Sequence, residues 1–120
     1  MSIFETSAGK LIGPTTGGTV TQATSKSTGV TLNKASGQIT MNDASLAAAA
    51  EVSFAVTNSE IAATDVVIVN HASGGTAGSY LVQANTIAAG SFAITVSNVS
   101  AGSLGEAIVL NYVALKGSSS

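Results

Sequence analysis

The fold is decided by residues 51–57, Glu-Val-Ser-Phe-Ala-Val-Thr, in which apolar and polar side chains alternate. An extended chain with this two-residue period carries Val52, Phe54 and Val56 on one face, as a strand with one buried side requires. β-Branched and aromatic residues dominate the stretch and suit a pleated sheet better than a helix. Similar short segments, bounded by Gly, Asn or Ser, occur at residues 18–22, 29–33 and 37–42.

Four more segments on the C-terminal side complete the prediction of an all-β fold. Apolar runs separated by Gly- and Ser-containing turns occur at residues 65–70, 79–84, 91–96 and 106–116. Regular short strands with such turns are typical of sandwiches and barrels. We therefore expect an antiparallel β-sandwich of jelly-roll type with about eight strands.

The chain has 120 residues, a length that points to a single domain. We expect an extended N-terminal arm over residues 1–18, where turn residues show no sustained period, then a sandwich domain over 19–117 and a flexible C-terminal tail over 118–120. Residues 43–50, Asp-Ala-Ser-Leu-Ala-Ala-Ala-Ala, are rich in the best helix former but too few for a stable helix. One short helical turn is predicted there.

Charged residues are scarce, because only 8% of the sequence is Asp, Glu, Lys or Arg. Four dispersed lysines cannot form a basic patch, so no nucleic-acid partner is expected. The longest apolar runs fall far short of the roughly 18 residues that span a bilayer, and no secretory signal is visible, so no membrane partner is expected. Interface cores are depleted of charge, which favours an assembly over the alternative, a neutral Thr-rich monomer.

The predicted strands at residues 65–70 and 106–116 are apolar on both faces. An antiparallel strand with one solvent-exposed side instead alternates apolar and polar residues. With so little helix, nothing within the chain can cover the second face, so a neighbouring subunit is expected to do so. The candidate subunit interface is the set Val67, Val69, Ile108, Leu110 and Tyr112. The opposite faces carry Val66, Ile68, Val109 and Val113, and the pattern leaves open which of the two sides is the core.

No residue pattern points to catalysis. The single histidine, His71, lies beside a Gly-rich stretch and several serines, but no Gly-x-Ser-x-Gly elbow accompanies it. We expect His71 to be a loop residue or a polar group at a subunit contact. Glu60 and Asp65 could face each other across a turn, although a structural role for both is favoured. Asn42-Asp43 is too weak a signal for a calcium site. We predict no enzyme activity and no catalytic, cofactor-binding or metal-binding residues.

Much of the sequence resembles small structural proteins of tailed bacteriophages and prophages. The most specific part is the string GGTVTQ at residues 17–22 followed by TGVTLNK at residues 28–34, and the resemblance continues to residue 117. It implies a virion component with no catalytic residues. We expect a homo-oligomer, as a trimer, that decorates the capsid shell and requires no cofactor. The alternative is a tail or head-fibre tip module that binds a host surface glycan or receptor.

The predicted arm carries apolar side chains that a purely flexible tail has no reason to expose: Ile3, Phe4, Leu11 and Ile12. If the chain decorates a capsid, these four residues are the expected contacts to the major capsid protein. The protein would then be located on the capsid surface of the virion, or on the tail under the alternative interpretation.

Overall fold

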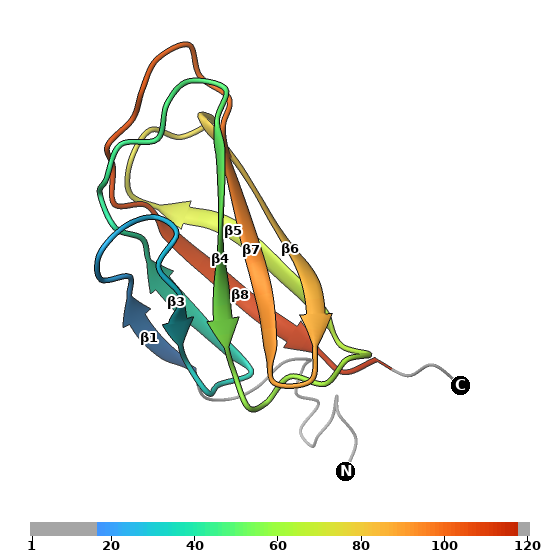
Figure 1. Cartoon of the computed structure of the whole chain (residues 1–120). Helices are drawn as coiled ribbons and strands as arrows, with labels where there is room; N and C mark the ends of the chain where they lie inside the picture. The colour runs from blue at the N-terminus through green and yellow to red at the C-terminus, as the bar shows by residue number, and fades with distance from the viewer. Residues whose placement is uncertain (1–16, 118–120) are drawn as a thin grey trace.

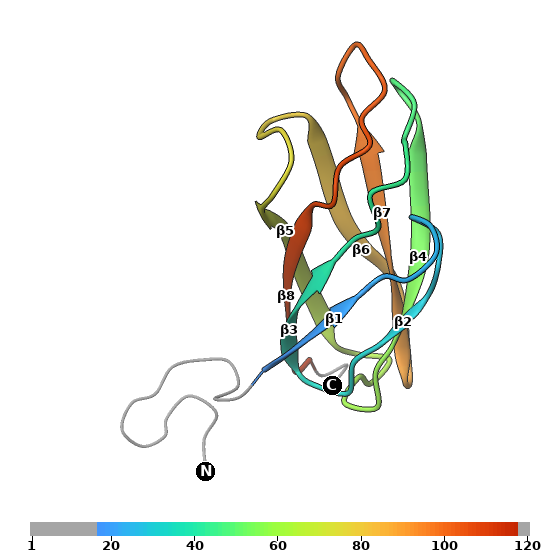
Figure 2. The ribbon, with the colours of Figure 1, turned by 90° about the vertical axis from the view of Figure 1, so that its left-hand side faces the viewer.

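The computed structural model describes residues 17–117, and these form eight strands in two four-stranded sheets (Figure 1). The order of strands in the first sheet is β1 (Gly18–Thr21), β3 (Ser36–Thr40), β8 (Val109–Leu115), β5 (Val66–Ser73). The order in the second sheet is β2 (Val30–Thr31), β4 (Glu51–Thr57), β7 (Ser91–Asn98), β6 (Tyr80–Ala88). Figure 2 shows the sheets as two layers face to face, which confirms the predicted all-β sandwich.

The sheets are mixed, whereas wholly antiparallel sheets were predicted. β1 pairs in parallel with β3, and β2 pairs in parallel with β4, while the other four pairs are antiparallel. From β1 to β4 the chain changes sheet after every strand, so the next strand in the same sheet comes only after two reversals of direction. Each such pair of strands therefore runs in the same direction. A jelly roll is antiparallel throughout, so that part of the prediction is wrong. Alternation identifies strands but not their neighbours.

The core fills the space between the two layers, where alternate residues of each long strand point inward. Phe92 and Tyr112 pack with ring centroids 5.4 Å apart, one from each sheet. Each large apolar side chain removed from water in this way contributes about 1.5–3 kcal/mol. The apolar side chains that are completely shielded are Ile39, Val56, Ile94, Val96, Ile108 and Leu110.

The predicted helical turn over residues 43–50 is not formed. Leu46 instead exchanges both backbone hydrogen bonds with Leu104, and a tight turn follows in which the Ala50 N–H donates to the Ala47 carbonyl at 3.1 Å. Ala49 has a φ of 64°, outside the helical region. A two-turn alanine segment is marginal alone, so these tertiary hydrogen bonds outweigh its helix propensity.

The sandwich begins one residue before the predicted boundary, because Gly18 opens β1. A side chain at its register partner Gly37 would come within 2.6 Å of Leu32 and 2.9 Å of the Gly18 carbonyl, so this close approach requires glycine. The other predicted arm residues up to 16, the contact residues Ile3, Phe4, Leu11 and Ile12, and the predicted tail 118–120 lie outside the described residues.

Candidate interaction surface

The outer face of the β1–β3–β8–β5 sheet carries a cluster of apolar side chains. The register places Val66 of β5 beside Leu115 of β8, and Ile68 beside Val113. Val66 and Ile68 are 54% and 51% exposed, so large apolar groups contact solvent here. Val109 lies further along β8 on the same side. These five residues are named the sheet-face patch. A contiguous exposed apolar patch marks an interaction site more reliably than scattered single residues do.

The five residues predicted to form the subunit interface lie on the inner side of the same strands. Ile108 and Leu110 are fully buried and Tyr112 is 4% exposed, while Val67 and Val69 pack against the core from partly buried positions. The prediction of this side as the interface is therefore wrong. The pattern is apolar on both sides of β5 and β8, and only the packing against the second sheet decides which side is the core.

A row of uncharged polar side chains crosses the outer face next to the sheet-face patch. Asn70, Asn111, Gln38 and Thr19 are neighbours by register on β5, β8, β3 and β1. The side-chain oxygen of Asn111 is buried and has no hydrogen-bond partner among residues 17–117. The face thus combines apolar and amide groups without a charged residue in the row.

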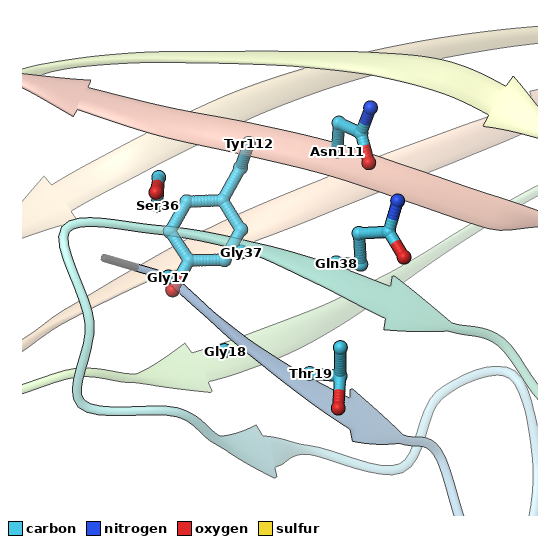
Figure 3. A pocket seen from close by; sticks show the side chains of 8 residues that line it. All are labelled: Gly17, Gly18, Thr19, Ser36, Gly37, Gln38, Asn111 and Tyr112. Atoms are coloured by element: carbon cyan, nitrogen blue, oxygen red, sulfur yellow. The ribbon is translucent and has the colours of Figure 1, made fainter. Parts of the chain in front are cut away.

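A shallow hollow of about 440 Å³ lies at the β1 end of this row (Figure 3). Tyr112 is the one titratable side chain among its lining residues. Its hydroxyl donates to the Lys34 carbonyl at 2.8 Å and accepts from the Asn58 side-chain N–H at 3.2 Å. Burial raises the pKa of Tyr112 to about 12, so the phenol stays protonated at neutral pH. The hollow therefore offers amide and hydroxyl groups but no general acid or base.

His71 lies in β5, whereas the sequence suggested a loop position. Its Nε2 atom is 2.6 Å from the Gly74 carbonyl oxygen and 3.0 Å from that of Ser73, and its ring meets Tyr80 edge-on with centroids 5.4 Å apart. Two carbonyl acceptors require Nε2 to be the protonated, donating nitrogen. The imidazole thus fastens the start of the β5–β6 loop and has the contacts of a structural residue.

Glu106 anchors the other side of the same loop. Its carboxylate accepts hydrogen bonds from the Tyr80 hydroxyl at 2.8 Å, the Thr76 N–H at 2.9 Å and the Thr76 hydroxyl at 2.7 Å. The Thr76 and Tyr80 bonds hold the pKa of Glu106 below its usual value. Burial and the bond to Glu106 raise the pKa of Tyr80 to about 12. Thr76, Tyr80 and Glu106 thus satisfy one another's hydrogen bonds and hold the β5–β6 loop in place.

Lys116 bridges the side chain of Asp65 and the backbone of Glu60. Lys116 Nζ donates to the Asp65 carboxylate at 2.8 Å and to the backbone carbonyl of Glu60 at 2.7 Å. Burial alone would raise the pKa of Asp65, but the hydrogen bonds from Lys116 and the Ala62 N–H outweigh it and lower this pKa. The arrangement closes the loop between β4 and β5 onto the end of β8.

Sequence reasoning missed Lys26, which is 4% exposed. Its ammonium donates to the Glu106 carbonyl at 2.7 Å and to the Asn42 carbonyl. Desolvation lowers its pKa, and the charges of Asp43 and Glu106 only partly oppose this. The surrounding Ser-Lys-Ser-Thr sequence reads as an exposed turn, so no local signal could have revealed the burial.

Residues 17–117 contain no group of three or more His, Cys, Asp or Glu side chains placed to hold a metal ion. In the same residues, no helix is long and apolar enough to cross a membrane. No protein-family model matches the chain, and neither the curated proteins nor the solved structures compared with it give a match.

Proposed function

We propose that the chain is a non-enzymatic structural protein of a tailed-phage virion, and that it decorates or cements the capsid shell as a homotrimer. The observation that carries this proposal is the sheet-face patch, where β5 exposes Val66 and Ile68 on a face whose amide row is uncharged. The phage assignment itself rests on the resemblance of residues 17–117 to small structural proteins of tailed phages.

The composition supports association with other chains. A soluble monomer usually carries a mixed charged surface, and only 8% of this sequence is charged. Covering the sheet-face patch with a neighbour would remove apolar area from water at about 25 cal/mol per Å². A virion protein that functions within an assembly needs little surface charge, because much of its surface is covered by neighbouring subunits.

A structural role also agrees with the state of the polar groups. The side chains of His71, Asp65 and Glu106 are each engaged by hydrogen bonds within the fold. A catalytic base needs a partner to act on and a cleft to act in, whereas these groups fasten loops.

The proposal assigns the attachment to the major capsid protein to Ile3, Phe4, Leu11 and Ile12. Burial of such side chains is worth roughly 1.5–3 kcal/mol each, and ordering the backbone costs about 1–2 kcal/mol per residue, so one arm binds weakly. Three arms on one trimer bind far more durably, because the second and third contacts form at high effective concentration.

Sedimentation with empty capsids tests the proposal. The full chain should co-sediment with shells of its own phage, and a variant lacking residues 1–16 should fold and form the same oligomer but stay in the supernatant. Equal binding by both variants would refute the role of the arm. Binding of both to purified tails or host envelopes, with none to shells, would replace decoration by the alternative role of a tail or head-fibre tip module.

A further inference from the structure

The exposed large apolar side chains of residues 17–117 occur in two places, one on each sheet. Val66 and Ile68 belong to the sheet-face patch described above. The other two are Leu81 and Val99, which are 65% and 52% exposed. Isolated exposed apolar residues are common on protein surfaces, whereas exposed apolar neighbours on one face indicate a contact surface.

Leu81 and Val99 are neighbours on the outer face of the second sheet. Leu81 of β6 stands opposite Ser97 of β7. Val99 follows two residues after Ser97, and its N–H donates to the Ser79 carbonyl at 2.9 Å, so the β6–β7 pairing continues to this point. Residues two apart on a strand point to the same side, which places Val99 diagonally beside Leu81. We name these two residues the corner patch.

The two patches lie on the outer faces of different sheets, which form the two layers in Figure 2. β5 and β6 are consecutive strands, so the loop between them joins the end of β5 to the start of β6. Val66 opens β5 and is remote from this loop, whereas Leu81 is the second residue of β6 and lies next to it. A single copy therefore cannot bring its own two patches together.

A charged residue borders each patch, and the two charges have opposite signs. Lys116 follows Leu115 of the sheet-face patch and its side chain is 58% exposed. Two of its three N–H donors bind Asp65 and the Glu60 carbonyl, which leaves one donor for a further acceptor. Exposed Glu51 stands opposite Ser97, in the same cross-strand row as Leu81.

We propose that the sheet-face patch of one copy packs against the corner patch of the next copy, with Lys116 of the first facing Glu51 of the second. This inference rests on the proposed oligomer and specifies its contact. Because the two patches lie on the outer faces of different sheets, one two-fold axis cannot bring both into a single contact, so the contact is heterologous. A heterologous contact builds a ring of three or more copies when the rotation between neighbours closes and a filament when it does not, and the proposed trimer is the smallest such ring.

Complementation between two variants tests the contact. Ile68→Lys disables the sheet-face patch and Leu81→Lys disables the corner patch. Both positions are exposed, so each variant should still unfold cooperatively in urea and differ from the wild type only by the stability that assembly adds. Each variant alone should have the mass of one chain, 11.7 kDa, by light scattering. An equimolar mixture should form a dimer of one chain of each kind, because one intact sheet-face patch and one intact corner patch remain. One contact lacks the support of a ring, so the mixture needs concentrations well above those at which the wild type assembles.

The controls separate this inference from the proposed function. Thr57→Lys adds the same charge at an exposed position of the second sheet, at the other end of β4 from Glu51, and should leave the oligomer intact. Glu51→Lys should weaken assembly by roughly five-fold or less, as an exposed ion pair contributes little. A monomeric wild type would overturn the proposed oligomer itself. An oligomeric wild type in which Leu81→Lys has no effect, or a mixture that stays monomeric, would overturn the heterologous contact alone.

Discussion

Replacing Lys26 by methionine should destabilise the sandwich strongly, although lysine is normally a surface residue. The ammonium joins three segments, because it lies after β1 and donates to the carbonyls of Asn42 and Glu106. Methionine has a similar length but no donor. Each carbonyl left without its partner costs about 1–3 kcal/mol, and relief of the desolvated charge offsets part of the sum. We expect a net loss of roughly 2–4 kcal/mol.

Urea unfolding followed by circular dichroism measures this loss. With an m value of about 2 kcal/mol/M, the midpoint should fall by roughly 1–2 M. Lys34→Met is the matched control, because Lys34 is exposed and its substitution should change stability by less than about 0.5 kcal/mol. If Lys26→Met and Lys34→Met unfold at the same midpoint, the two carbonyl contacts contribute nothing and the reasoning is refuted.

Three further sets of substitutions test the two sheet faces, the Asp65 ion pair and the role of His71. Leu110→Ala should cost about 2–5 kcal/mol because it opens a cavity in the core, whereas Ile68→Ala should weaken assembly and leave unfolding of the isolated chain nearly unchanged; similar stability losses in both would contradict the assignment of faces. The folded pKa of Asp65 lies below its ordinary value of 3.8, so its stabilising contribution is complete above pH 3.8 and is lost as the pH falls through the folded pKa. In Asp65→Asn the acid side of the curve of stability against pH should therefore be flatter than in the wild type, and an unchanged slope would contradict this role of Asp65. His71→Ala should lower stability by about 1–2 kcal/mol through the lost carbonyl bonds and the edge contact with Tyr80, and an unchanged urea midpoint would contradict that role.

The periodicity of the sequence predicted the strands well and their neighbours poorly. Alternation in residues 51–57 is a local property of the chain, and β4 has these bounds. The parallel pairing of β1 with β3 depends on where the chain crosses between sheets, which no local pattern records. The helical turn predicted from the alanines after Leu46 was wrong for a related reason, because hydrogen bonds to Leu104 and Asn98 outweigh the helix propensity of these alanines.

The interaction surface was predicted on the correct strands but on the wrong side. β5 and β8 are apolar on both sides, and a slip of one position exchanges the two faces. Burial of Leu110 and exposure of Ile68 decide between them, and both depend on the second sheet. The corner patch left no signal at all, since Leu81 and Val99 become neighbours only through the β6–β7 register.

The copy number of the chain in purified virions tests the central claim most directly. Quantitative mass spectrometry against the major capsid protein gives the ratio of the two chains in intact particles and, separately, in heads and tails. A capsid decoration protein should occur in heads at a fixed, lattice-sized ratio to the major capsid protein. A handful of copies per particle, found with the tails, would contradict decoration of the shell.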